Sequence, residues 1–405
     1  MRPFFAPACA RMERDKGLNP KPEPGFRNPN SFLVITMKTH IHLPAFRLAT
    51  APNKSVARAA LPSPRPLART SVLHSLASVL GLLPAVLCLL AASPQDGATT
   101  IVKVAAGASH SLYLTDEGNL YGMGANNNGQ LGVSGTDDRL TPVLIASNVI
   151  DMAAGYTHSL FVKNDGTLWA MGNNDYGQLG NGLRYVSSLS PVQIATGVKT
   201  VAAGETSSFF VKSDGTLWAM GRDAYQQLAG LYGGSIDPVI PAPQQADTDV
   251  TGMAAGRDHS LIVKSDGRLY AWGCNDNGQL GNGTTNINNT YAQLTTNGAT
   301  VAAGDSHSLY VTRDGKLYAM GLGKNGQLGF NAGTYLNYRC STPQQVTTTS
   351  SVAAISAGYA HSMFTTTDGK LYTMGYNYYG QLGDGTATTA TTTTTTITTN
   401  MRQVN

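Results

Sequence analysis

"AAGYTHSLFVKNDGTLWAMGNNDYGQLG", residues Ala153–Gly180, contains the pattern that decides the fold of this chain. Two short runs in it, HSLFVK and TLWAMG, alternate between two sets of side chains, and Asp165-Gly166 lies between them. Asp-Gly between two such runs is a strong signal for a β-hairpin, because both turn residues tolerate positive φ. The closing GQLG adds two glycines, which suit positions of positive φ or close backbone approach. The stretch therefore predicts a hairpin followed by a tight loop.

The stretch recurs along the chain. Spacings of 48, 49, 52, 48 and 54 residues separate the glycines that end its small-residue tripeptide, namely Gly107, Gly155, Gly204, Gly256, Gly304 and Gly358. Self-similarity at such a period indicates a repeat architecture, in which each unit buries its apolar face against its neighbours. We expect repeat cores near residues 101–132, 149–180, 198–229, 250–281, 299–329 and 352–383.

The repeats predict an all-β fold. No stretch outside the N-terminal region has sustained helical periodicity, and three or four short strands per repeat, arranged radially, would form a β-propeller. We expect six or seven blades built from ~50-residue repeats over residues 94–405. Residues 384–405 are expected either to close the ring by pairing with the first blade or to begin a truncated repeat, because ITTNMRQVN resembles the segment that begins at Ile145.

Residues 1–93 form a basic leader. They contain 12 Lys and Arg against 3 Asp and Glu, a net charge of +9, whereas residues 94–405 contain 16 against 21, a net charge of −5. The apolar segment 72–92 follows a basic flank and ends in small residues, which predicts a signal peptide, or a membrane anchor if it is not cleaved. An organelle transit peptide is the alternative. We therefore expect a secreted, cell-surface or periplasmic protein whose only membrane contact is this segment.

The charge distribution also bears on the partners. The acidic repeat region lacks the basic surface that nucleic-acid binding requires, so no nucleic-acid partner is expected. The variable polar segments after each GQLG are a candidate location for recognition, since loops on a rigid frame commonly carry binding residues; tolerated surface variation is the alternative.

Three repeated positions are singled out as structural: the six tripeptide glycines, a histidine, and the glutamine of GQLG. The histidines and glutamines are His110, His158, His259, His307, His361, Gln130, Gln178, Gln279, Gln327 and Gln381. A ring of imidazoles could hold a metal ion; alternatively, each histidine hydrogen-bonds backbone within or between blades. No Asp or Glu repeats beside the histidines to orient them as metal ligands, which favours the structural hypothesis. No catalytic, metal-binding or cofactor-binding residue is predicted, and no cofactor.

The cysteines give no zinc motif, because the chain has no CxxC pair. Cys274 and Cys340 could form a disulfide in an oxidising compartment, but two free thiols are the expectation.

The combined motif AAGxxHSL…DGxLYxMGxNxxGQLG resembles the repeat of the regulator of chromosome condensation family, in a bacterial-type exported form, over roughly Thr100 to Gly385. The resemblance implies a β-propeller, usually of seven blades, and a structural role for the histidine. The third copy departs from the pattern, with Ser207 in place of the histidine and YQQLAG in place of YGQLG.

The function expected from these features is that of a monomeric, non-enzymatic, exported propeller that binds a protein or a surface polymer. The resemblance implies an alternative, guanine-nucleotide exchange on a small GTPase with chromatin contact. A metal-dependent enzyme built on the histidine ring is the third and least favoured hypothesis, since fold alone does not fix activity.

Overall fold

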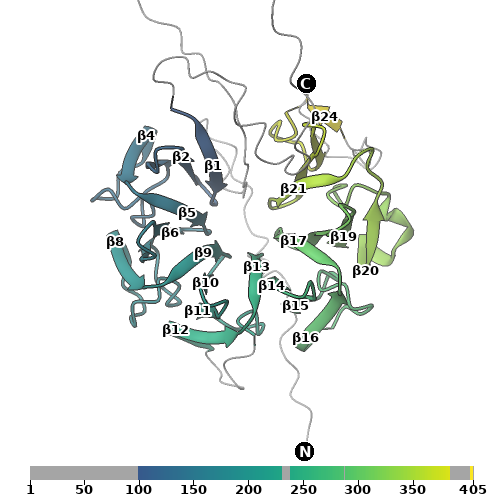
Figure 1. Cartoon of the computed structure of the whole chain (residues 1–405), viewed down its shortest axis with the longest axis horizontal. Coiled ribbons are helices and arrows are strands. Elements are labelled where there is room, and N and C mark those ends of the chain that lie inside the picture. The colour runs from purple at the N-terminus through teal and green to yellow at the C-terminus, as the bar shows by residue number, and fades with distance from the viewer. Residues whose placement is uncertain (1–98, 230–237, 287, 384–401, 405) are drawn as a thin grey trace, which may run out of the picture. The chain divides into compact units, whose positions relative to one another are not determined.

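The computed structural model describes residues 99–229, 238–286, 288–383 and 402–404. The leader with its apolar segment 72–92 and residues 384–401 lie outside the described residues. The described chain forms six four-stranded sheets and almost no helix. The all-β propeller prediction is confirmed, with six blades (Figure 1). Among the described residues, no helix has the length and apolar character needed to cross a bilayer.

The strands and two short 3₁₀ helices have the following bounds: β1 (Ile101–Ala106), β2 (His110–Thr115), β3 (Leu120–Gly124), β4 (Arg139–Ala146), β5 (Val149–Ala154), β6 (His158–Lys163), β7 (Leu168–Gly172), β8 (Ser188–Ala195), β9 (Val198–Ala203), β10 (Ser207–Lys212), β11 (Leu217–Arg222), β12 (Val239–Asp247), β13 (Val250–Ala255), β14 (His259–Lys264), β15 (Leu269–Gly273), β16 (Asn288–Thr295), β17 (Gly298–Ala303), β18 (His307–Thr312), β19 (Leu317–Leu322), η2 (Ala332–Thr334), η3 (Leu336–Tyr338), β20 (Arg339–Val346), β21 (Val352–Ala357), β22 (His361–Thr366), β23 (Leu371–Gly375) and β24 (Arg402–Val404).

Each blade is an antiparallel meander. Its four strands are hydrogen-bonded in chain order, with the first strand of each blade nearest the centre and the fourth at the periphery (Figure 1). The hairpin predicted at Asp165-Gly166 forms between β6 and β7, where Phe161 pairs with Trp169. Gly166 has φ +78° and its N–H donates to the carbonyl of Lys163 at 2.9 Å. The Asp-Gly signal therefore works because the turn requires a positive φ that glycine adopts freely.

The C-terminal strand β24 belongs to the sixth blade. It pairs with β23, with Leu371 opposite Val404, and so is the fourth strand of that blade, in chain order as in the other five. The described tail residues thus do not pair with the first blade, which was one of the two expected arrangements. The outer edge of β23 offers unpaired backbone groups, and an adjacent strand satisfies them.

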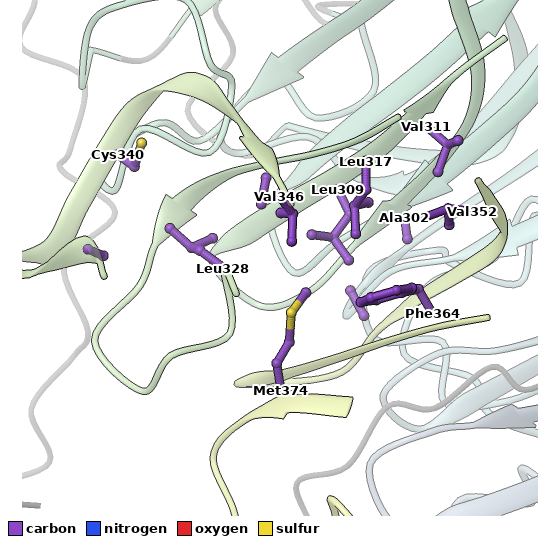
Figure 2. Close-up of a cluster of buried hydrophobic side chains, with 13 residues drawn as sticks. Ala302, Leu309, Val311, Leu317, Leu328, Cys340, Val346, Val352, Phe364 and Met374 are labelled. Atoms are coloured by element: carbon purple, nitrogen blue, oxygen red, sulfur yellow. The ribbon is translucent and has the colours of Figure 1, made fainter. Parts of the chain in front are cut away.

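Consecutive blades are joined by buried apolar clusters. One blade contributes aliphatic side chains of its second and third strands, and the next contributes an aromatic or aliphatic residue and, at the third strand, a methionine or tryptophan. Figure 2 shows the cluster between the fifth and sixth blades, where Leu309 and Leu317 meet Phe364 and Met374. Burying one such side chain contributes roughly 2 kcal/mol. Five clusters of this kind join the six blades in sequence.

The two cysteines of the repeat region are not bridged to each other. Cys340 is a free, fully buried thiol in the cluster between blades five and six, and its Sγ lies 3.1 Å from the carbonyl of Thr342. Cys274, which follows β15 in the fourth blade, is disulfide-bonded. The expectation of two free thiols therefore holds for Cys340 and is wrong for Cys274.

Candidate functional site

One face of the propeller carries both the turns after the innermost strands and the GQLG loops. The two kinds of loop are joined by backbone bonds, for example from Asn173 N to Thr157 O at 2.9 Å and from Cys274 N to Asp258 O at 2.8 Å. The Asp-Gly hairpin turns lie at the opposite ends of the same strands. We call the first face the axial face and define it by residues 107–109, 155–157, 204–206, 256–258, 304–306 and 358–360 with the loops that follow the third strands.

The repeated histidines bond from one blade to the next. Their Nε2 atoms lie 2.8 to 2.9 Å from a serine Oγ of the following blade, in the pairs His110–Ser159, His158–Ser208, His259–Ser308 and His307–Ser362. Each of these serines donates its own proton back to the carbonyl of the GQLG glutamine in the preceding blade, at 2.7 to 2.8 Å. The expected backbone acceptor for the histidine is thus wrong. The partner is a serine hydroxyl some 50 residues away.

This relay fixes the state of each imidazole. Because the serine proton goes to a carbonyl, Nε2 must carry the hydrogen that bonds Ser Oγ, and Nδ1 is then a bare acceptor. The Nδ1 atoms of His110, His158, His259 and His307 are indeed buried without a partner. Burial lowers the pKa of His110 and His259 to about 4, since a charged ring would hold an unpaired N–H in a dry interface.

The structure does not bring the five histidines together. They are separated into different blade interfaces, and four of them already use Nε2 for a serine. In the part of the chain that the structure describes, no group of three or more His, Cys, Asp or Glu side chains is placed to hold a metal ion. We infer that these histidines tie blades together.

Four of the tripeptide glycines lie directly against the imidazole of their own repeat, where no side chain fits. A Cβ at Gly256 would lie 2.4 Å from Cε1 of His259 and 2.5 Å from the carbonyl oxygen of Gly304. Gly107, Gly155 and Gly304 show the same close approach to their own histidines. The GQLG glutamines have a local role as well: Gln130 Oε1 accepts the N–H of Asn128 at 2.9 Å and so stabilises its own loop.

The irregular third copy is accommodated by the fourth blade. Ser207 stands in place of the histidine, and Trp272 replaces the methionine that neighbouring blades carry at the equivalent position. The indole N–H of Trp272 donates to the carbonyl of Gln227 at 2.8 Å, and Ser260 donates to the same carbonyl at 3.0 Å. The larger Trp272 of the fourth blade thus accompanies the smaller Ser207 of the third blade.

The interface between the sixth and first blades differs from the other five. Among the described residues, no hydrogen bond joins His361 to Ser111 and no apolar cluster spans these two blades. Ser111 is partly exposed, whereas its equivalent Ser159 is fully buried. Among the described residues the His–Ser relay is therefore interrupted twice: between the third and fourth blades, where Ser207 replaces the histidine, and between the sixth and first blades.

A cavity of about 230 Å³ lies at the centre of the axial face, lined by residues of all six blades. Alanines and glycines from the ends of the innermost strands form most of its wall. The polar and aromatic lining residues are Tyr156, Glu205, Arg257, Asp305 and Tyr359. Each follows directly after a tripeptide glycine. Sequence analysis missed these residues, although a signal was present: this position varies inside a stretch that is otherwise copied.

Arg257 is the centre of an ion-pair cluster at the cavity. Its Nε lies 3.1 Å from Glu205 Oε2 and 3.2 Å from Asp258 Oδ2, and its Nη1 lies 3.4 Å from Asp305 Oδ1. Burial raises the pKa of Glu205 and of Asp258, and the repulsion between neighbouring carboxylates adds to this in both cases. Burial opposes the charge of Arg257, but the three carboxylates together raise its pKa. One guanidinium thus serves three carboxylates.

Further aromatic side chains lie in the loops of the axial face. Tyr376, Tyr378 and Tyr379, in the loop after β23, contact one another through their rings, and Tyr379 is 57% exposed. Arg222 lies over the ring of Tyr176 at 5.1 Å. Exposed tyrosines beside charged groups are typical of recognition surfaces.

The chain is similar in sequence to proteins of a known family. The family described as RCC1-like domain matches residues 89–331, and the regulator of chromosome condensation (RCC1) repeat matches residues 314–365 and 352–381. The Ultraviolet-B receptor UVR8 of Arabidopsis thaliana is 31% identical over 157 residues, which cover 38% of this chain and 36% of the receptor. This chain therefore matches about a third of the length of that relative.

Two solved structures share the fold. Prp20p from Saccharomyces cerevisiae has a TM-score of 0.61 at 22% identity, covering 72% of this chain and 75% of that one. Human WBSCR16 has a TM-score of 0.57 at 21% identity, covering 70% and 78%. With six blades of the matching repeat and a family match over more than half its length, this chain belongs to the RCC1-like domain family.

Proposed function

We propose that the chain is a non-enzymatic, exported binding module whose axial face holds a protein or a surface polymer. The observation that carries the proposal is the cavity at the propeller axis. In five blades, the residue that follows the tripeptide glycine lines this cavity, and its type differs between repeats that are otherwise similar. Repetition serves the architecture, and variation at a shared surface supports recognition. The other face presents the repeated Asp-Gly turns, and the positive φ that each hairpin requires is enough to explain their repetition.

The axial face can be tested by photo-crosslinking in the cell that makes the protein. A photoreactive phenylalanine analogue is introduced at exposed Tyr379 on the axial face, or at exposed Lys316 beside an Asp-Gly turn on the other face. We expect a discrete crosslinked product from position 379 and none from position 316, detected by a mass shift. Products from both positions alike, or from 316 alone, would remove the axial face from the proposal.

Export rests on the leader and needs its own measurement. We expect the mature chain to begin near Pro94 and to be found outside the cytoplasm, because residues 72–92 fit a signal peptide. N-terminal sequencing and cell fractionation decide this. A full-length chain in the membrane fraction would indicate a tethered module, and an intact cytoplasmic chain would contradict export.

Guanine-nucleotide exchange is the second candidate function. It is supported by the likeness in fold to Prp20p, a protein with binding properties to Gsp1p and histones. That binding is a property of Prp20p, and a likeness at 22% identity shows only the fold. Acceleration of labelled GDP release from a small GTPase of the same cell by the purified chain would favour exchange over the non-enzymatic module.

A further inference from the structure

The axial cavity has a size that suits part of a partner. Its volume is about 230 Å³, below the roughly 300 Å³ at which pockets for whole small-molecule ligands begin. Alanines and glycines, including Ala154, Ala203 and Gly304, form most of its wall, so an apolar stem can contact small apolar groups there. The space therefore matches one extended side chain or one small ion.

The charges around the cavity are unbalanced. Glu205, Asp258 and Asp305 all lie within 3.4 Å of the single guanidinium of Arg257. Asp258 and Asp305 are largely buried, with side-chain exposures of 11% and 13%. Arg222, which lies over Tyr176, also acts electrostatically on Glu205 and Asp258, so the three carboxylates exceed the two cations by one negative charge. Buried carboxylates that outnumber their cations favour a further cation.

Two aromatic residues complete the lining. Tyr156 and Tyr359 line the cavity from the second and sixth blades, away from the carboxylates of blades three to five. A cation near tyrosine rings gains a further attraction. An anion in the cavity would face the carboxylates of Glu205 and Asp305 and an arginine whose Nε and Nη1 are already bonded. Size, charge and lining thus favour the same class of ligand.

We propose that the axial cavity binds a primary ammonium or guanidinium group carried on an apolar stem, presented as a lysine or arginine side chain of the partner. This proposal deepens the proposed function. It rests on that function only in taking the cation to belong to a macromolecular partner. A free diamine offers the same chemistry from another source, and the experiment separates the two.

The test uses the full chain and four probes: N-acetyl-lysine methylamide, putrescine, n-butanol and sodium butyrate. We expect saturable binding of the lysine derivative by calorimetry, with the neutral and anionic probes inactive. Glu205→Gln should weaken that binding about tenfold or more, since a hydrogen-bonded charge is removed. Asp314→Asn, an exposed hairpin residue on the other face, should leave it unchanged.

The outcomes separate the two proposals. Tighter binding of the lysine derivative than of putrescine supports both the cation site and a macromolecular partner. Tighter binding of putrescine supports the cation site and counts against the proposed function. Butyrate binding, no saturable binding of either cation, or an equal loss in Asp314→Asn would overturn the cation site. Urea unfolding of Glu205→Gln verifies that the variant is folded.

Discussion

The propeller is expected to unfold when the pH falls from 6.5 toward 4. Five buried histidines have depressed pKa values, about 4 for His110, His259 and His361 and about 3 for His158 and His307. The unfolded chain binds a proton on each ring near pH 6.5, and the folded chain does not until the pH reaches these lower values. The stability is therefore complete above pH 6.5 and is lost as the pH falls through this window.

The size of the effect follows from the number of protons. Each proton taken up on unfolding costs about 1.4 kcal/mol of stability per pH unit. Glu205 and Asp258 act in the opposite sense because their pKa values are raised. A net uptake of about three to five protons gives about 4 to 7 kcal/mol per pH unit, and a domain stability of about 5–15 kcal/mol would be exhausted within a few units.

Urea unfolding at several pH values between 7.5 and 4.5 measures this slope. The variant His259→Gln keeps an N–H donor without a titrating ring, so its slope should be about 1.4 kcal/mol per pH unit shallower. A stability that does not change between pH 7 and 5 would show that the imidazoles are not held neutral between the blades.

Gly256→Ala is expected to destabilise the propeller by about 3 kcal/mol or more, because an added methyl in a packed site forces its surroundings to move. The new Cβ would lie 2.4 Å from the ring of His259 and 2.5 Å from the carbonyl oxygen of Gly304. The carbonyl belongs to the next blade, so relief requires the two blades to separate. Gly252→Ala is the matched control in the same strand, since its nearest neighbour would be Val263 Cβ at 3.9 Å.

Equilibrium urea unfolding at pH 7.5 compares these variants. Gly252→Ala should change the stability by less than about 1 kcal/mol. The double variant Gly256→Ala with His259→Ala lacks the ring that the new methyl would strike. Its loss of stability should therefore be smaller than the sum of the losses in the two single variants. Equal stability of Gly256→Ala and Gly252→Ala, or full additivity with His259→Ala, would contradict the role assigned to this glycine.

Much of the fold is specified by residues that lie close together in the sequence. The alternating runs around Asp165-Gly166 specify a hairpin because side chains on a strand alternate between two faces and the turn needs a positive φ. That unit recurs about every 50 residues, which indicates a repeat fold in which each blade buries its apolar face against the next. These two facts were enough to predict an all-β propeller and to place its repeated residues, but they left the number of blades and the role of residues 402–404 open.

The sequence by itself determined the repeat, its strands and turns, and the positions of histidine, glycine and glutamine within each blade. Only the tertiary structure decided that His259 bonds Ser308 of the next blade, and that Glu205, Arg257 and Asp305 meet at one cavity. The physical reason is that the first set depends on neighbours within a few residues. The second depends on how blades pack around an axis, which brings together side chains separated by one or two whole repeats.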